Sequence, residues 1–134
     1  MGRRFRALKL WFVIRTYGLD RIRQMIRAHI DLAQDFAALI DAEEDFERLA
    51  PTPLALVCFR YRPVEVSSAA ELDGINERIV KAINDGGEAY LTHTRLAGAY
   101  TMRVSIGQTA TRRHHIENLW ELIKVTARNL KLGV

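Results

Sequence analysis

Residues 100–106 alternate strictly between apolar and polar side chains, and this pattern constrains the fold more than any other in the chain. The apolar positions are Tyr100, Met102, Val104 and Ile106, and the polar positions are Thr101, Arg103 and Ser105. Successive side chains of a β-strand point to opposite faces of the sheet. We therefore predict a strand that is buried on one face and carries Arg103 in the middle of the other face.

The remaining segments supply helices and further strands. Apolar residues at helical spacing predict helices over 5–17, 19–42, 69–84 and 112–130. Short apolar runs predict an edge strand over 46–49, an inner strand over 54–61, and a strand over 89–94 that forms a hairpin with 100–106 around residues 96–99. The order α-α-β-β-α-β-β-α predicts an α+β fold, with a small antiparallel sheet of three to four strands and helices packed on one face.

The first helix is unusually apolar for the end of a chain. Its apolar side chains are nearly continuous and comprise Leu8, Leu10, Trp11, Phe12, Val13 and Ile14. Gly18 then supplies a residue that can end the helix in the left-handed conformation. Because a small domain cannot cover so much apolar surface, we expect this helix to pack against a partner.

Length and cysteine content narrow the class of protein. The chain has 134 residues, which is enough for one domain with a real core. Its single cysteine, Cys58, lies in an apolar run and is interpreted as a small buried hydrophobe. There is no apolar stretch of membrane-spanning length, and no signal-like apolar block follows the N-terminal charges. These features predict a soluble, cytoplasmic protein.

Charge is distributed unevenly along the chain. Residues 1–30 carry +7 (eight Arg and Lys, one Asp), which leaves −3 for the other 104 residues of a chain with a total charge of +4. Because these arginines alternate with large apolar residues at helical spacing, we interpret them as the solvent-exposed face of an amphipathic helix. Nucleic-acid binding, which would depend strongly on salt, is the less favoured alternative. The acidic run 41–45 is interpreted as a solvated turn.

The spacing of histidines and glycines indicates no metal or phosphate site. The adjacent His114 and His115 are expected to point to different sides of a helix, where they cannot easily chelate one ion. His29 lies on an apolar helical stripe, where a partly buried, hydrogen-bonded imidazole is expected. Gly86 and Gly87 follow a helix rather than opening one, so they do not form a phosphate-binding loop. No catalytic triad can be identified from spacing.

Arg103 is the polar residue that stands out. Its guanidinium lies mid-strand beside Thr101 and Ser105 and could bind a planar carboxylate or phosphate through two hydrogen bonds. The alternative is an ordinary cross-strand charge on a solvated face of the sheet, and spacing alone favours that alternative.

Several segments resemble one enzyme family across nearly the whole chain. The most specific segment is 2–15 (GRRFRALKLWFVIR), which is followed by Tyr17 and Gly18. The others are 56–60 (LVCFR), Asn76, Ile83 and Asn84, 92–94 (THT) with Gly98 and Tyr100, 102–107 (MRVSIG) and 116–123 (IENLWELI). Together they resemble the group II pyridoxal-phosphate-dependent decarboxylases, the family of the aromatic-L-amino-acid decarboxylases.

The resemblance is to the C-terminal part of that family. It implies that residues 1–18 form a connecting apolar helix, that residues 19–134 form the small C-terminal α+β domain of a fold-type I enzyme, and that the large cofactor-binding domain is absent. In the family the lysine that holds the cofactor follows a histidine, and none of the four lysines here does so. The resemblance therefore implies no catalytic residue, no cofactor ligand and no metal ligand in this chain, and no covalently bound pyridoxal phosphate.

For Arg103, the resemblance implies a role in binding the acidic group of the amino-acid substrate. It further implies a homodimer whose small domain contributes to the substrate cleft and to subunit packing. Two hypotheses about function follow. The chain is either a fragment of a pyridoxal-phosphate-dependent amino-acid decarboxylase, inactive by itself, or a stand-alone interaction domain that kept the fold and lost the chemistry.

Overall fold

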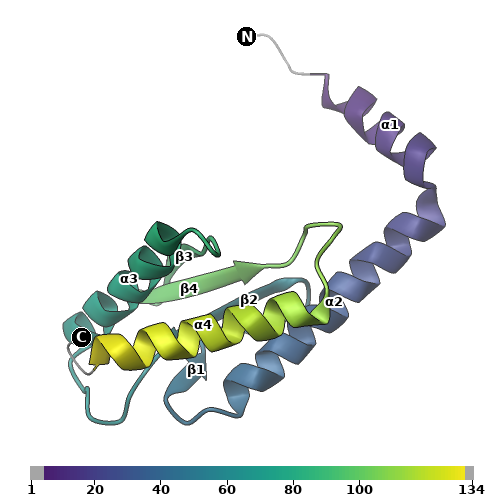
Figure 1. The fold of residues 1–134 in the computed structure, drawn as a ribbon. Coiled ribbons are helices and arrows are strands. Elements are labelled where there is room, and N and C mark those ends of the chain that lie inside the picture. Colours follow the sequence, from purple (N-terminus) through teal and green to yellow (C-terminus); the bar gives the residue numbers. More distant parts are fainter. Residues whose placement is uncertain (1–4, 132–134) are drawn as a thin grey trace.

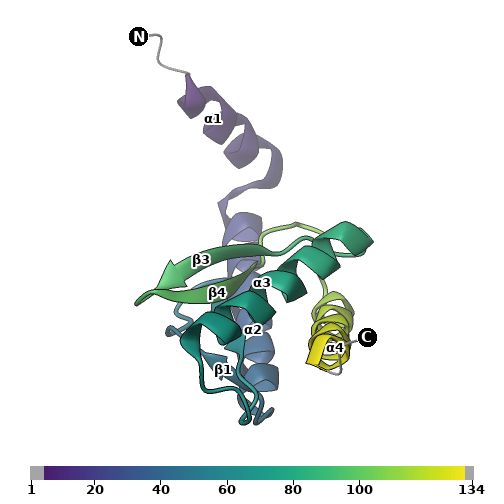
Figure 2. The ribbon, with the colours of Figure 1, turned by 90° about the vertical axis from the view of Figure 1, so that its left-hand side faces the viewer.

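A computed structural model describes residues 5–131 and contains four helices and four strands in the predicted order. The elements are α1 (Arg6–Tyr17), α2 (Leu19–Asp41), β1 (Phe46–Arg48), β2 (Leu56–Tyr61), α3 (Ala69–Gly86), β3 (Thr92–Leu96), β4 (Ala99–Ser105) and α4 (Arg113–Lys131). The strands form one antiparallel sheet in the order β1-β2-β4-β3, which places β1 at an edge as predicted. Figures 1 and 2 show α2, α3 and α4 gathered on one side of this sheet. The predicted α+β architecture is confirmed.

An aromatic cluster joins the sheet to the helices. Phe59 of β2 packs edge-on against Phe36 of α2 and Trp120 of α4, with ring centroids 5.6 and 6.2 Å away. Phe46 of β1 lies 4.7 Å from the same Trp120 ring. The apolar positions of β4 belong to this core, since Met102 is fully buried beneath the helices. The period-two pattern therefore identified the covered face of the sheet correctly.

The β3–β4 hairpin turns more tightly than the sequence indicated. Leu96 and Ala99 remain paired, so only Ala97 and Gly98 form the turn. Both residues have positive φ, 49° and 85°, as in the two-residue turns that match the twist of antiparallel strands. The predicted four-residue connection is therefore wrong. The strand predicted over 89–94 lies instead at Thr92–Leu96, because the short turn carries the pairing further along the chain.

Helix α1 projects away from the rest of the molecule (Figure 1). None of its residues is buried, and Trp11 and Phe12 keep about half of their surface exposed, 52% and 54%. The Gly18 N–H donates to the carbonyl of Ile14 at 2.9 Å and closes the last turn, and the positive φ of Gly18 (75°) separates α1 from α2. Among the described residues, no helix is both long and apolar enough to cross a lipid bilayer.

Two asparagines tie α3 to neighbouring backbone. Asn76 is fully buried, and its amide forms 2.8 Å hydrogen bonds with both the N–H and the carbonyl of Tyr61 at the end of β2. Further along α3, Asn84 bonds in the same way to Leu91, at 2.7 and 3.0 Å, just before β3. An asparagine side chain offers a donor and an acceptor together, so each amide acts as a strand partner would. These bonds fix α3 against the sheet.

The acidic run 41–45 is not a simple solvated turn, and that prediction is wrong. Glu43 pairs with Lys124 and Arg128 of α4, at 3.2 and 2.8 Å, and Asp45 lies 3.6 Å from Arg128. Burial alone would raise the pKa of Glu43, but the hydrogen bonds and charges of Lys124 and Arg128 outweigh it and lower that pKa. The run therefore joins the end of α2 to α4.

Candidate substrate-binding face

Arg103 lies in the middle of β4, on one of the two central strands of the sheet. It is paired across the sheet with Cys58 of β2 and with Thr92 of β3. Since the neighbouring Met102 and Val104 point into the helix-covered core, the pleat directs Arg103 to the opposite, open face. The guanidinium is half-buried there. A side chain in this position is held by hydrogen-bonded strands on both sides.

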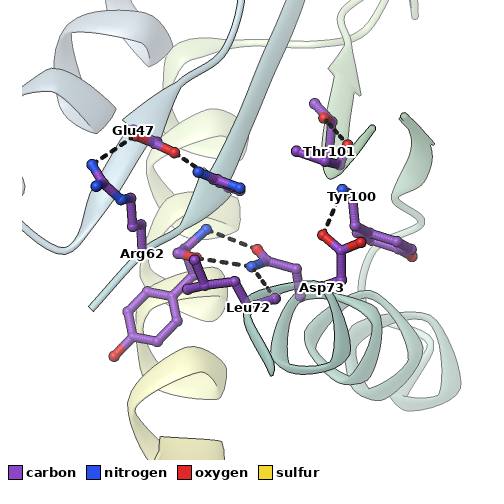
Figure 3. Close-up of polar contacts among 10 residues, drawn as sticks. Glu47, Arg62, Leu72, Asp73, Tyr100 and Thr101 are labelled. Atoms are coloured by element: carbon purple, nitrogen blue, oxygen red, sulfur yellow. Dashed lines mark hydrogen bonds and ion pairs between the residues drawn. The ribbon is translucent and has the colours of Figure 1, made fainter. Parts of the chain in front are cut away.

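The other polar side chains of the open face already have partners. The Thr101 hydroxyl, fully buried, donates to the carbonyl of Ala99 at 3.0 Å. Arg60 of β2 keeps only 16% of its side chain exposed and pairs with Glu47 of β1, whose second oxygen lies 3.2 Å from Arg62. Figure 3 shows Glu47 between its two basic neighbours. Glu47 thus offsets the positive charge of Arg60.

Arg103 differs from Arg60 in having no such partner. Within residues 5–131 its guanidinium makes no hydrogen bond and no ion pair with another side chain or with backbone. A half-buried, unpaired guanidinium is costly unless an anion completes it, because burying a charge without a partner is unfavourable. Its planar fork matches a carboxylate or phosphate through two parallel hydrogen bonds. The open face around Arg103 is therefore the candidate site, and its guanidinium has the geometry to bind a planar anion.

The hairpin that carries this site is fastened to α3 by one carboxylate. Asp73 accepts a 2.8 Å hydrogen bond from the Tyr100 N–H and pairs with Arg95 at 2.6 Å, as the contact between Asp73 and Tyr100 in Figure 3 shows. Arg95 also donates to the carbonyl of Gly98 in the turn at 2.7 Å. The Tyr100 hydrogen bond lowers the pKa of Asp73; burial opposes this effect, and Arg95 adds to it. This arrangement holds β4, and with it Arg103, in place.

Two residues lie where the sequence placed them. Cys58 is buried and is not in a disulfide. His29 is 7% exposed, and its Nε2 lies 3.1 Å from the carbonyl of Gln108, to which it donates. The first is therefore a small buried hydrophobe and the second a buried, hydrogen-bonded imidazole, as predicted.

The prediction for His114 and His115 is wrong. Their rings lie together at the start of α4, with centroids 3.9 Å and Nε2 atoms 3.1 Å apart. The reason is that His115 turns back and accepts a 3.0 Å hydrogen bond on Nδ1 from the Arg112 N–H, which caps the helix. In the described part of the chain no three side chains of the kinds that bind metals form a group.

The residues that surround Arg103 could be found only in part from the sequence. Alternation in β4 identified Arg103, but the ion pair between Arg60 and Glu47 was missed. The sequence does mark Arg60, because this charged residue interrupts the apolar run of β2. It does not show that Glu47 is the partner of Arg60, because that depends on the register between β1 and β2. That pairing decides which arginine of the face remains without a partner.

The fold and this open face define a class of protein. The four-stranded antiparallel sheet, covered by helices on one side, matches the fold of part of the fold-type I pyridoxal-phosphate decarboxylases. The described structure superimposes on the crystal structure of Oryza sativa TDC with PLP and tryptamine with a TM-score of 0.86 and 36% identity, over 96% of this chain and 28% of that one. Mouse CSAD, at 18% identity and a TM-score of 0.83, shares the fold.

Comparison of the sequence shows which family the chain resembles. Residues 1–62 match the pyridoxal-dependent decarboxylase conserved domain. Tyrosine decarboxylase 4 of Petroselinum crispum is 39% identical over 92% of this chain, and phenylacetaldehyde synthase of a Rosa hybrid cultivar is 40% identical over 92%. The chain is similar to the group II pyridoxal-phosphate-dependent decarboxylases over nearly its whole length. It spans about a quarter of the length of these curated relatives, 25% and 26%.

The cofactor of the family is pyridoxal phosphate, and the residues of this chain do not fit its covalent attachment. All four lysines lie on helices: Lys9 on α1, Lys81 on α3, and Lys124 and Lys131 on α4. Lys81 pairs with Asp85, and Lys124 pairs with Glu43 and Glu121. Within the described range, the open face that carries Arg103 therefore presents no lysine. We derive no chemical step through the cofactor from this chain.

Proposed function

We propose that this chain is the small domain of a pyridoxal-phosphate-dependent decarboxylase and that its open sheet face covers the substrate cleft. One observation carries the proposal: Arg103 is half-buried on a rigid strand and has no partner among the described residues. In this role the guanidinium binds the acidic group of an amino acid and orients it. Arg103 transfers no proton, because a guanidinium stays protonated at any working pH.

The substrate class follows from the relatives. Their names include tyrosine decarboxylase and tryptophan decarboxylase, and a phenylacetaldehyde synthase is equally similar. We therefore propose an aromatic amino acid as the substrate and loss of carbon dioxide as the reaction.

We propose that residues 1–18 connect this domain, residues 19–134, to the large cofactor-binding domain. The large domain and a partner subunit would then cover the apolar surface of α1, and the enzyme would be a homodimer. Since the single cysteine is compatible with a reducing compartment, we place the enzyme in the cytoplasm.

Substitution of Arg103 in the full enzyme that contains this domain tests the proposal. Arg103→Lys keeps the charge and removes the planar fork, so we expect kcat/KM to fall about tenfold or more, as a lost charged hydrogen bond implies. The melting temperature should change little, because Arg103 has no partner within the described fold. Arg78→Lys is the matched control, since Arg78 is exposed on α3 and its side chain has no hydrogen bond or ion pair with the described residues. Normal kinetics for Arg103→Lys would refute the assigned role.

A stand-alone interaction domain remains the second hypothesis. The exposed apolar surface of α1 favours it, because such a surface fits a separate partner protein as well as a large domain. The coding DNA upstream of Met1 discriminates between the two. An open reading frame with an in-frame histidine–lysine pair supports the enzyme fragment, and a stop codon without such a pair supports the stand-alone domain.

A further inference from the structure

A cavity of about 320 Å³ lies where α2 meets the loop that joins β4 to α4. One wall comes from successive turns of α2 and includes Arg21, Met25 and His29, and the facing wall comes from the loop and includes Thr111 and Arg112. Tyr17, at the end of α1, completes the rim. The volume lies within the range of small-molecule sites. Helix α2 packs on the covered side of the sheet, so this cavity is separate from the open face that carries Arg103.

The charge of the cavity favours an anion. Arg21 and Arg112 line it from opposite walls, and no carboxylate is found among the described lining residues. The cavity also lies in the strongly basic part of the chain, since residues 1–30 carry +7. A concave surface lined by charge of one sign concentrates ligands of the other sign. The proposed function leaves this basic segment without a role.

The walls are held in place before any ligand binds. His29 is 7% exposed, and its bond to the carbonyl of Gln108 ties α2 to the loop. Arg112 donates from Nη1 to the carbonyls of Thr109 and Thr111, at 3.2 and 2.8 Å. The other N–H groups of its guanidinium have no partner among the described residues. Such pre-organisation lowers the cost of binding, because neither wall must be ordered by the ligand.

The α2 side of the cavity also includes an apolar part, hereafter the floor, formed by Ile22, Met25 and Ala28. Two cationic groups above an apolar floor fit a ligand with one anionic end and one hydrocarbon end. We propose that this cavity binds small carboxylates that carry an aromatic or aliphatic body, with Arg21 and Arg112 on the carboxylate and the body against Met25.

Titration with phenylacetate and with its neutral analogue phenylacetamide tests the proposal. We expect saturable binding of phenylacetate at about millimolar Kd or tighter, with NMR shifts concentrated in residues 21–29 and 109–112. Phenylacetamide should bind at least threefold more weakly, and added salt should weaken phenylacetate binding because the arginines are near solvent. Equal binding of the two compounds, or no saturable binding, overturns the proposal. Equally tight binding of inorganic phosphate also overturns it, since the apolar floor would then contribute nothing.

Three variants locate the site. Arg21→Gln should weaken phenylacetate binding about threefold to fivefold, as expected for an ion pair near the surface. Arg23→Gln is the matched control, because Arg23 lies on the same helix, outside the cavity, and pairs with Asp20. Ala28→Phe fills the floor without changing any charge and should abolish binding while the far-ultraviolet circular dichroism stays unchanged. Equal effects of Arg21→Gln and Arg23→Gln, or unchanged affinity in Ala28→Phe, refute the site.

Discussion

At the scale of single residues, Asn76 shows how one buried amide replaces a strand. It bonds to the N–H and the carbonyl of Tyr61, and its Nδ2 also donates to the carbonyl of Leu72 at 2.8 Å. The end of β2 therefore obtains from a helix the hydrogen bonds that a neighbouring strand would supply. Periodicity in the sequence cannot reveal these bonds. Asn76 lies on the apolar stripe of α3, where periodicity predicts an apolar residue and gives no role for an amide.

Asn76→Ala should lower the free energy of unfolding by about 2–4 kcal/mol, because Tyr61 loses two buried hydrogen bonds. Asn118→Ala is the control, since Asn118 is exposed on α4, and it should change the free energy by no more than about 0.5 kcal/mol. Urea unfolding followed by circular dichroism measures both variants. Equal stabilities of the two variants would show that the buried amide contributes nothing.

Asp73 gives the fold a dependence on pH. The pKa of Asp73 is lower in the folded chain than in the unfolded chain, chiefly because of the Tyr100 hydrogen bond. A carboxylate of this kind stabilises the fold above its unfolded pKa, about 3.9, and the stabilisation is lost as pH falls through the folded pKa. Asp73→Asn should therefore be less stable than the parent chain at pH 7, and the difference should shrink toward pH 3.

Urea midpoints of the parent chain and of Asp73→Asn, measured at pH 7 and at pH 3, test this expectation. Glu43 also has a lowered pKa, but it is present in both proteins, so the difference between them isolates Asp73. A difference that stays constant between the two pH values would contradict the linkage.

At the scale of elements, the positions of helices and strands followed from the sequence because each has a clear period. Helix α2, predicted over 19–42, runs from Leu19 to Asp41, and α1 and α4 also lie within a residue or two of the prediction. The predictions were wrong for segments whose structure depends on residues far away in the sequence. Strand β3 is defined by its pairing with β4 around a two-residue turn, and the acidic run 41–45 by the basic residues of α4.

The apolar face of α1 is the element-scale feature that the described fold leaves uncovered. Burial of one large apolar side chain contributes about 1.5–3 kcal/mol, so several together favour association. We expect the 134-residue chain to associate at micromolar concentration, with a dimer as the simplest closed form. Sedimentation velocity should then show a species larger than the monomer.

The double variant Trp11→Gln and Phe12→Gln should shift this equilibrium toward the monomer, because both side chains lie on α1 and are about half exposed. Val125→Gln is the control, since Val125 is an exposed apolar residue on α4, 54% exposed, far along the chain from α1. A parent chain that sediments as a monomer, or a dimer that the double variant leaves intact, would count against association through α1.

At the scale of the whole molecule, the chain offers a residue that can bind an anion but, among the described residues, no lysine placed to hold a cofactor beside it. Its open sheet face presents a guanidinium that can orient an anion, yet the lysines of the chain lie on helices, and Lys81 and Lys124 are paired with acids. The fold class could be predicted from the order of elements. The proposed role of the open face could not, because the order of elements says nothing about what lies against that face.

We therefore expect the 134-residue chain to release no carbon dioxide from amino acids when pyridoxal phosphate is added. The panel comprises the aromatic amino acids, glutamate and histidine, and the reference is a solution of the cofactor and each amino acid without protein. The physical reason is that no lysine of this sequence follows a histidine, and that Lys81 and Lys124 are already paired with acids. Release clearly above the reference, and abolished by changing one lysine such as Lys124 to Ala, would show that the chain holds the cofactor productively by itself. Release equal to the reference, together with an unchanged cofactor absorbance spectrum, is the expected result.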